Sequence, residues 1–528
     1  MISIQAISIY RDRVAALRPE WWVGIGATIA ALISTAISLV WGTIVAYGDA
    51  ESHLNIAKRV VSSVTPGFAQ LGGIWLPLPH LMMTPFVWID MLWRTGLAGS
   101  IVSGVCFVIS AIFIYKLVYL LTHEIGPALF GATAFVANPN ILYMQATPMT
   151  ELPLIAFFIL STYYFIRYVK DRDNVLMLVA AAFFGFCASL SRYDGWALVL
   201  MEAGVLFLMY VRSKSWKKTE GILIVFCTLA FFGVIIWLLW GWLILGDPLY
   251  FTHSEFSAKS QQQSWFARGE LPAYGHILTS LEYYAYTSMS NIGIFATELA
   301  LLGLVMFSIA KEQKDRIFTL LILAVPFVFN VATLYLGQSV IFIPGLTPAS
   351  YQWDLFNVRY GMMMVPFAAV MIGYLMYRMK SRWLRGAVGV GVAIQCAVFA
   401  LGYAPVLTYA DGVNGLSSEI AKISDAQVWL EKNYDHGMIL LDDFSRSVSI
   451  IRTRIPMQEV IYVGNKPYWD ESLKQPEKYA TWIVMQKNDP IWNSLYNDPV
   501  LQGRLFKYFN KVYESEDNLL IFKRIRDA

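Results

Sequence analysis

The chain has 528 residues, of which 57% are hydrophobic and only 15% are charged. Soluble domains carry about 25% charged residues, so this composition excludes an ordinary soluble protein and predicts a polytopic membrane protein. The formal net charge of +3 at pH 7 is too small to indicate a nucleic-acid partner.

Apolar runs of membrane-spanning length recur from the start of the chain to about residue 405. The first run is longer than the core of a signal peptide, so we interpret it as a retained anchor. The runs predict about eleven transmembrane helices. The predicted spans are 21–46, 98–121, 127–146, 152–168, 174–190, 195–211, 221–245, 289–310, 317–336, 359–378 and 386–405.

Lysine and arginine are distributed unevenly between the connections of these spans. Eighteen lie in one alternating set of connections, which begins with Arg11, Arg13 and Arg18, and seven lie in the other set. Because basic residues are enriched in cytoplasmic loops, this asymmetry predicts a cytoplasmic N-terminus in a multi-pass cell membrane protein. It also favours interfacial helices at about 50–95 over a further crossing, since a crossing there would invert the asymmetry.

The interfacial prediction has support from the residues of that segment. Leu54, Ala57 and Val61 fall on one stripe of a helix whose opposite stripe is polar, a pattern typical of helices that lie on a membrane surface. The following stretch, "LPLPHLMMTPFVWIDMLWRT", is apolar but contains three prolines together with Asp90 and Arg94. We therefore assign residues 1–405 to a membrane domain with these interfacial helices.

The composition changes after residue 405, where charged residues become frequent. The apolar runs "GMILLDD", "TWIVMQ" and "NLLIFKRI" predict strands, and segments 419–432 and 491–509 predict helices. Residues 406–528 are thus predicted to form a soluble α/β domain. An odd number of spans places this domain outside the cytoplasm.

The predicted topology gathers polar groups at the extracytoplasmic ends of the spans. Ionisable residues at the edge of a bilayer are costly and indicate function by default. These groups are Asp49, Glu51, His53, His80, Glu151, Arg192, Tyr193, Asp194, His253 and Arg359.

Several of these residues also have structural interpretations. Asp49 is suited to be the N-cap of a helix over 50–63, although position 52 is Ser and not the acid or amide of a capping box. Arg192 and Asp194 can form a local turn contact. Arg359 suits either interfacial snorkelling or the grip of a phosphate.

The layout resembles the GT-C class of membrane glycosyltransferases. The stretch "GDAESHL" after the first span, the interfacial segments, the second acid Glu151 and an external C-terminal domain carry this resemblance. The class includes bacterial relatives of protein O-mannosyltransferases and the lipid A aminoarabinose transferases. The resemblance implies that Asp49 is the catalytic carboxylate and that Glu151 is the acid of the second external loop.

Two departures from family patterns stand beside this resemblance. The O-mannosyltransferase pattern has adjacent Asp and Glu, whereas Ala50 separates Asp49 from Glu51 here, so the resemblance assigns no role to Glu51. The oligosaccharyltransferase branch has a Trp-Trp-Asp-Tyr-Gly motif. The stretch "PYWDES" at 467–472 lacks the second Trp and the Tyr-Gly, and we treat it as a coincidence.

The resemblance implies an inverting transfer of a sugar from a polyprenyl-phosphate donor to a glycan, lipid or protein acceptor outside the cytoplasm. Asp49 is expected to deprotonate the acceptor, and Glu151 to orient it or to share a metal with Asp49. Arg359 and Arg192 are expected to offset charge on the departing phosphate. A divalent metal, Mg or Mn, is compatible with these acids, but no spacing requires it. Substrate contacts are expected from Glu51, His53, His80, Tyr193, Asp194 and His253.

Two other classes of function stay open. A transporter or flippase for lipid-linked sugars would also have many spans and intramembrane charges, but such proteins often contain repeated halves, and no repeat is evident here. An O-antigen ligase or polymerase would act on similar lipid-linked substrates. Such an enzyme is expected to rely on arginine and histidine more than on paired acids.

Overall fold

The computed structural model describes residues 18–211, 216–254, 257–417, 424–442, 448–515 and 518–525. Arg11 and Arg13 of the charge pattern, and residues 419–423 of a predicted helix, lie outside these ranges. The chain divides into two compact units, which we describe separately. The helical unit is Met1–Trp41, Gly73–Pro79 and Ser100–Asp411, and the mixed unit is Gly42–Gly72, His80–Gly99 and Gly412–Ala528.

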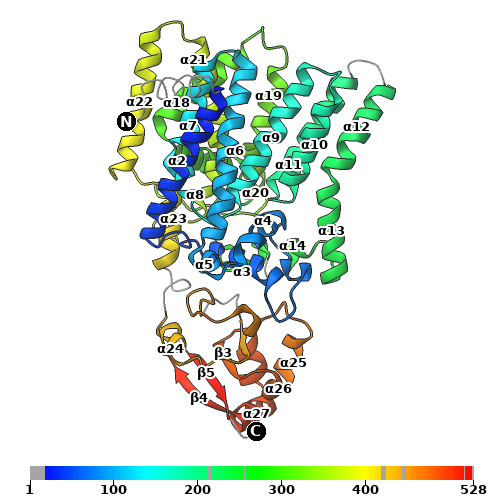
Figure 1. Ribbon diagram of the computed structural model, residues 1–528, viewed down its shortest axis with the longest axis vertical. Helices are drawn as coiled ribbons and strands as arrows, with labels where there is room; N and C mark the ends of the chain where they lie inside the picture. The colour runs from blue at the N-terminus through cyan, green and yellow to red at the C-terminus, as the bar shows by residue number, and fades with distance from the viewer. Residues whose placement is uncertain are drawn as a thin grey trace, which may run out of the picture. The chain divides into compact units, whose positions relative to one another are not determined.

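Long apolar helices dominate the helical unit (Figure 1). Within the described residues, six helices are long and apolar enough to cross a membrane, or up to nine if each bent pair is one span. The six are α2 (Pro19–Val40), α6 (Leu97–Thr122), α9 (Glu151–Lys170), α11 (Asp194–Val211), Val358–Arg378 (η2, Val358–Met364, and α21, Val365–Arg378) and α22 (Arg382–Ala400). The polytopic helical fold is thereby confirmed, whereas the count of eleven stays a prediction.

The remaining helices of this unit are bent or short. The bent pairs turn by 45°, 110° and 43°, and they are α12 (Trp216–Ala230) with α13 (Phe232–Leu245), α17 (Ile277–Ile292) with α18 (Ile294–Ser308), and α19 (Arg316–Leu323) with α20 (Val325–Tyr335). The shorter helices are α7 (Ile125–Val136), α8 (Pro139–Met144), α10 (Val175–Ser189), α14 (Tyr250–His253), α15 (Ala258–Gln261) and α16 (Gln263–Ala267).

The largest bend falls within one predicted span. Gly293 lies between α17 and α18 with φ at +91°, a conformation that glycine adopts at little cost. Helix α17 therefore ends at Ile292 and α18 begins at Ile294, so the predicted span 289–310 contains the bend and covers all of α18. The apolar pattern marked α18 only, because α17 has a polar composition with several Tyr and Ser residues.

Small residues allow the helices of this unit to pack closely. Helix α9 packs against α10, and α10 packs against α11 and α12, as their parallel course in Figure 1 shows. Helix α18 lies against α21, where a Cβ on Gly303 would come within 2.2 Å of the Met371 carbonyl oxygen. Glycine at such contacts lets the backbones of two helices approach.

The N-terminal part of the mixed unit consists of short helices. They are α3 (Gly48–Val61), η1 (Phe68–Leu71), most of α4 (Leu78–Val87) and α5 (Asp90–Thr95). Between Trp41 and Gly96 the structure contains no helix that meets the length and hydropathy of a span. The apolar stretch 76–95 is thus two short helices separated near Trp88, as its prolines and charges favour. Their interfacial position stays a prediction.

The C-terminal part of the mixed unit is a five-stranded sheet with helices around it (Figure 1). The strand order is β2-β1-β3-β5-β4, with β1 parallel to β2 and β3, and β5 antiparallel to β3 and β4. The strands are β1 (Ile439–Leu441), β2 (Val460–Ile461), β3 (Trp482–Gln486), β4 (Phe509–Glu514) and β5 (Leu519–Arg524). The helices are α24 (Asp425–Asn433), η3 (Met457–Glu459), α25 (Tyr468–Lys474), α26 (Pro476–Tyr479), η4 (Trp492–Tyr496) and α27 (Pro499–Tyr508). Helix α23 (Leu407–Ser417) belongs to the helical unit up to Asp411 and to the mixed unit from Gly412.

The predicted α/β domain is confirmed in its class. All three predicted strands form, as β1, β3 and β5. The sequence missed β2, which has only two residues, and β4, whose "FNKVYE" has mostly exposed side chains. Both are edge strands of the sheet, where an apolar sequence pattern is weakest. The predicted helix 491–509 forms as two shorter helices, η4 and α27, broken before Pro499.

Asp489 gives this sheet a pH dependence. Burial raises the pKa of its carboxyl from 3.8 to about 6, although the Gln486 and Trp492 backbone N–H groups each donate to it at 2.6 Å. The folded state therefore binds the proton more tightly than the unfolded state. This contribution to stability is fully present below pH 3.8 and is lost as the pH rises through about 6, and its size is about 3 kcal/mol.

Hydrogen exchange of the β3 amides in the full-length protein measures this effect. After correction for the intrinsic pH dependence of exchange, we expect protection of β3 to fall between pH 4 and pH 6.5. We expect the Asp489→Asn variant, which has no titrating carboxyl, to lack this slope. An equal slope in the variant would assign the pH dependence to other groups.

Candidate active site

Three charged side chains from distant parts of the sequence, two buried and one partly buried, meet in the helical unit. The Oε1 atom of Glu151 lies 3.0 Å from Nη1 of Arg192 and 3.2 Å from Nε of Arg359. Glu151 is fully buried and the Arg359 side chain is 7% exposed, whereas the Arg192 side chain is 19% exposed. The structure thus brings together the predicted acid of the second loop and both predicted phosphate-binding arginines.

Local sequence explains how each of the three residues reaches this point. Glu151 is the first residue of α9, where the helix dipole stabilises a negative charge. Arg192 lies in the tight turn between α10 and α11, where a Cβ on Gly195 would come within 2.2 Å of the Ala188 carbonyl oxygen. Arg359 follows Asn357, whose φ of +57° starts η2. Asparagine tolerates this left-handed conformation better than most residues.

Two further acids surround the arginines. Asp194 Oδ2 lies 3.4 Å from Nε of Arg192, and Asp411 Oδ2 lies 3.9 Å from Nη1 of Arg359. Burial opposes the charge of Arg192, but Glu151 and Asp194 outweigh it and raise the pKa of the guanidinium above its usual range. We call Glu151, Arg192, Asp194, Arg359 and Asp411 the charged cluster. With two arginines and three acids, it is compensated in charge to within one unit.

An aromatic ring and a threonine complete the surroundings. The guanidinium carbons of Arg192 and Arg359 lie 5.3 and 5.2 Å from the centre of the Tyr360 ring, within the range of cation–π attraction. Arg192 Nη1 also donates to Oγ1 of Thr150 at 3.2 Å. The Tyr360 carbonyl accepts a hydrogen bond from the Tyr284 hydroxyl at 3.1 Å. This bond ties the backbone of Tyr360 to α17.

Two carboxylate oxygens of the charged cluster, Asp194 Oδ1 and Glu151 Oε2, are buried without a hydrogen-bond partner among the described residues. Buried carboxylate oxygens are costly to leave unsatisfied, and unexplained ones often mark a binding function. Glu151 Oε2 can accept a hydrogen bond from a hydroxyl or amine.

The surroundings of Glu151 do not suit a divalent metal. Two guanidinium groups already lie within 3.2 Å of Oε1, and they would repel a cation bound to the same carboxylate. In the described ranges no three His, Cys, Asp or Glu residues are placed to hold a metal ion. The two arginines therefore disfavour a metal at Glu151, and a metal on Asp49 stays a prediction.

Gly361 is expected to be critical for the placement of Arg359. A Cβ at this position would lie 2.4 Å from the Thr287 carbonyl oxygen and 2.7 Å from Nδ2 of Asn291, which donates to the Val358 carbonyl. Gly361→Ala should therefore push η2 away from α17 and destabilise the protein by about 1–3 kcal/mol.

Thermal unfolding of the purified protein tests this expectation. Gly204→Ala in α11 is the matched control, because no atom lies within 4 Å of its new methyl group. We expect the control to unfold at or above the temperature of the wild type, since alanine favours a helix interior over glycine. Equal unfolding temperatures for the two variants would contradict the close packing of η2.

Two other residues of the helical unit that were predicted to bind substrate, Tyr193 and His253, are not part of the charged cluster. The Tyr193 hydroxyl donates to the Ile74 carbonyl at 2.7 Å, and its ring stacks on Phe251. His253 is mostly exposed and has Asp247 within 2.7 Å, in its own loop. A role for either in substrate binding stays a prediction.

The mixed unit contains the remaining predicted residues. Helix α3 begins at Gly48 with Tyr47 as N-cap, so Asp49 lies inside the first turn and the N-cap interpretation of Asp49 is wrong. Glu51 accepts hydrogen bonds from the Ser449 hydroxyl at 2.7 and 2.8 Å. His53 and His80 are buried, with Nδ1 of the first 2.8 Å from Nε2 of the second.

The sequence did not indicate three residues that contribute to the contacts of the charged cluster and of Glu51. Asp411 follows the last predicted span and was assigned to the soluble domain, although it belongs to the helical unit. Tyr360 is adjacent to Arg359, and "VRYG" offered an aromatic next to a cation as the only signal. Ser449 lies 398 residues from its partner Glu51, and no local pattern indicates such a contact.

A family comparison and a fold comparison agree with this description. Residues 88–240 match the family model described as dolichyl-phosphate-mannose-protein mannosyltransferase. This match includes Glu151, Arg192 and Asp194. A comparison with curated proteins found no match.

Solved structures similar to this chain include ArnT in two states and an archaeal oligosaccharyltransferase. ArnT from Cupriavidus metallidurans bound to undecaprenyl phosphate has a TM-score of 0.57 at 11% identity, over 96% of this chain and 98% of that chain. Its apo state has a TM-score of 0.51 at 12% identity, over 94% and 97%. The archaeal oligosaccharyltransferase AglB from Archaeoglobus fulgidus, in complex with an inhibitory peptide and a dolichol-phosphate, has a TM-score of 0.48 at 12% identity, over 96% and 75%.

At this level of identity the likeness to ArnT establishes the fold. The chain therefore has a GT-C-type fold over nearly its whole length, and the predicted resemblance to GT-C membrane glycosyltransferases is confirmed.

Proposed function

We propose that this protein is an inverting glycosyltransferase that moves a sugar from a polyprenyl-phosphate donor to an acceptor outside the cytoplasm. The observation that carries the proposal is the fold, which is shared with a protein solved with undecaprenyl phosphate bound. The match of residues 88–240 to a mannosyltransferase family model supports the same donor class. The proposed orientation has a cytoplasmic N-terminus and an external C-terminal domain, because basic residues are concentrated in one alternating set of loops.

The chemistry of this transfer requires a base and a stabilised leaving group. An acceptor hydroxyl or amine attacks the anomeric carbon, the bond from that carbon to the phosphate oxygen breaks, and the lipid phosphate leaves with the electron pair. Asp49 is proposed to take the proton of the acceptor as general base. Its place in the first turn of α3 supports this role, because the helix N-terminus stabilises the carboxylate.

The charged cluster is proposed to order the acceptor and the phosphate. The unpartnered Oε2 of Glu151 supports a contact with the acceptor. Arg192 has the more exposed of the two arginine side chains, which favours it over Arg359 for direct contact with the phosphate. Arg359 is proposed to hold Glu151 and Arg192 in place and to add positive charge near the leaving group.

Arg192→Ala is expected to weaken binding of the donor lipid about tenfold to a hundredfold, since a charge-assisted hydrogen bond is lost. Binding of undecaprenyl phosphate to the purified protein measures this. Arg172→Ala, which removes an exposed arginine of the α9–α10 connection, is the control. Equal affinity of both variants would remove Arg192 from the phosphate site.

Incubation of the purified protein with a panel of polyprenyl-phosphate sugars tests the function itself. Mass spectrometry should detect free polyprenyl phosphate together with a glycosylated acceptor or slowly released sugar of inverted configuration. A flippase would move the lipid across a vesicle membrane and leave the sugar–phosphate bond intact. An intact bond for every donor would overturn the proposal.

A further inference from the structure

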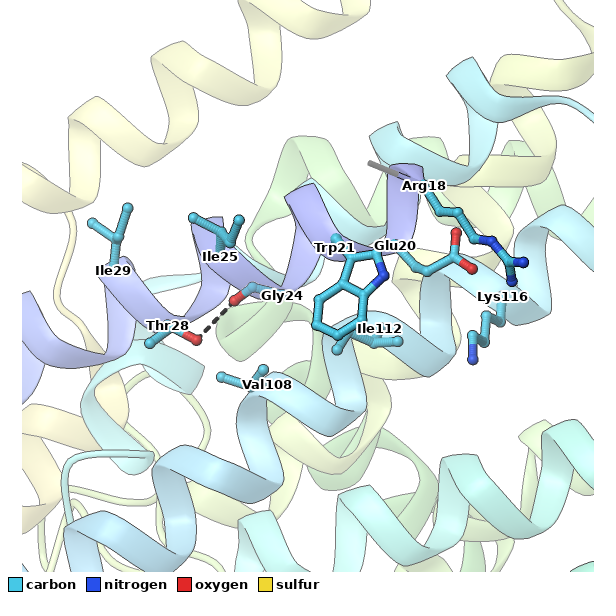
Figure 2. Close-up of a pocket in the computed structure, with 10 residues that line it drawn as sticks. All are labelled: Arg18, Glu20, Trp21, Gly24, Ile25, Thr28, Ile29, Val108, Ile112 and Lys116. Carbon is cyan, nitrogen blue, oxygen red and sulfur yellow. Dashed lines mark hydrogen bonds between the residues drawn. The ribbon is translucent and has the colours of Figure 1, made fainter. Parts of the chain in front are cut away.

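A basic and apolar groove lies between α2 and α6, in the helical unit and apart from the charged cluster. It has a volume of about 800 Å³. Figure 2 shows Arg18, Glu20 and Lys116 at one end and Ile29 and Val108 toward the other. The residues that line it are Arg18, Glu20, Trp21, Gly24, Ile25, Thr28, Ile29, Val108, Ile112 and Lys116.

The spacing of these residues makes the groove continuous along both helices. Val108, Ile112 and Lys116 recur every four residues and so lie on one face of α6. Gly24 opens the facing side of α2, where an added Cβ would come within 3.2 Å of Cδ1 of Ile112. Thr28 donates its hydroxyl to the Gly24 carbonyl at 2.8 Å, so its polar group is satisfied within the helix.

The length of the groove matches one leaflet of a bilayer. At 1.5 Å per residue, the stretch from Arg18 to Ile29 rises about 16 Å and that from Val108 to Lys116 about 12 Å. Half of a bilayer's hydrocarbon core is about 15 Å. The charged end therefore falls at the level of lipid headgroups when the apolar end lies near the bilayer centre.

We propose that this groove binds an anionic phospholipid of the leaflet at which α2 begins. Arg18 and Lys116 hold the phosphate of the headgroup, and one acyl chain lies along the apolar side chains. Basic pockets between transmembrane helices are suited to such headgroups. Glu20 opposes this binding, since two cations and one acid leave the mouth with a single positive charge. Most of α2 faces away from the protein, which leaves the groove open to lipid.

Native mass spectrometry of the full-length protein from nanodiscs tests this proposal. The wild type should retain phosphatidylglycerol in preference to phosphatidylcholine. The double variant Arg18→Gln/Lys116→Gln should lose that preference by roughly twenty-fivefold, at about fivefold for each residue. Lys311→Gln/Lys314→Gln, at exposed positions outside the groove, is the matched control and should keep it. Glu20→Gln should strengthen retention, a gain that misfolding does not produce.

Three outcomes would overturn the proposal. The first is equal retention of both lipids by the wild type, and the second is an unchanged preference in the double variant. The third is a rise in retention of both lipids on deletion of residues 2–17, which would assign the groove to that segment of the chain.

A second set of contacts, within the mixed unit, concerns the helix that carries Asp49. Residues 449–455, in the connection from β1 to β2, and Tyr462, just after β2, contact the first-loop helices. Arg94 of α5 donates to the carbonyl oxygens of Ile450, Ile451 and Ile455 at 3.4, 3.0 and 3.4 Å. The guanidinium of Arg59 lies 3.7 Å from the centre of the Tyr462 ring.

Glu51 adds the contact that fixes the rotation of α3. The Ser449 hydroxyl lies within 2.8 Å of both carboxylate oxygens of Glu51. Successive residues of a helix are about 100° apart, so Asp49, two residues earlier, lies roughly opposite Glu51 on α3. With Glu51 held at Ser449, the rotation of α3 about its axis is set, and with it the position of Asp49 on that helix.

We infer that Glu51 is a positioning residue that aims Asp49 through the C-terminal sheet domain, an inference that rests on the proposed function. Ser449→Ala should slow turnover about tenfold to a hundredfold with little change in the KM for the donor, because misplacement of a catalytic group lowers the rate without removing binding. Ser449→Thr keeps the hydroxyl and should restore turnover.

Hydrogen exchange separates this inference from the proposed function. In Ser449→Ala we expect the α3 amides to exchange about tenfold to a hundredfold faster, as for the loss of a hydrogen bond to a charged group. If the α3 amides exchange faster in Ser449→Ala but the wild type has no transferase activity, the proposed function is overturned and the positioning role of Glu51 is kept. Unchanged exchange of α3, or failure of Ser449→Thr to protect it, would overturn the positioning role.

Discussion

Asp49→Asn is expected to reduce sugar transfer by about 10²–10⁴-fold, the range for loss of a positioned general base. The amide has nearly the same shape as the carboxylate but accepts no proton from an attacking hydroxyl or amine. Donor binding and folding should be retained, because the proposed phosphate contacts belong to the charged cluster. Transfer of sugar from a polyprenyl-phosphate donor, followed by mass spectrometry, measures the loss.

Two measurements accompany this variant. Undecaprenyl phosphate binding shows whether the site is still assembled, and Asp173→Asn, an exposed acid between α9 and α10, is the isosteric control. We expect the control to transfer sugar at the rate of the wild type. Full activity of Asp49→Asn would remove Asp49 from the mechanism, and loss of lipid binding would make its role structural.

Glu151→Gln is expected to destabilise the protein by about 3–5 kcal/mol, the usual cost of breaking a buried ion pair from one side. The substitution leaves Arg192 and Arg359 buried with one negative charge fewer. Glu202→Gln is the matched control, since Glu202 is also fully buried but its oxygens accept from the Ser161 hydroxyl at 3.0 Å and, among the described residues, have no arginine within ion-pair distance. Thermal unfolding of the purified variants compares the two.

A double variant separates charge balance from lost function. In Glu151→Gln/Arg359→Gln one positive charge is removed together with the negative one, so we expect part of the stability to return. The two substitutions should therefore be less than additive, as for residues in contact. Sugar transfer should stay low. If Glu151→Gln destabilised the protein no more than Glu202→Gln does, this result would contradict the ion pairing at Glu151.

Hydropathy and charge predicted the architecture well because burial in lipid constrains them strongly. A membrane helix must be apolar over its whole length, so the segments that became α2, α6, α9 and α21 were legible in the sequence. Helix α17 was not, because its polar residues face other parts of the protein and Gly293 bends it from α18. Strand β2 has two residues and presents too little pattern for any periodicity.

The charged cluster was predictable in part and for a physical reason. Glu151, Arg192 and Arg359 each stood out because charges at the edge of apolar runs are expensive. Their pairing at 3.0 and 3.2 Å was not predictable, since the residues are 41 and 208 positions apart. The contact of Glu51 with Ser449 depends in the same way on tertiary folding.

The proposed mechanism requires that Asp49 and Glu151 act at the same face of the membrane. Labelling with an impermeant thiol reagent in intact cells and in inverted vesicles tests it, in a background where the four native cysteines are replaced. Ala69→Cys reports the first loop, and Asp173→Cys reports the end of α9 opposite Glu151; both positions are exposed. We predict labelling of Ala69→Cys from outside and of Asp173→Cys only from the cytoplasmic side. Labelling of both from the same side would place Asp49 and Glu151 on opposite faces and contradict the account.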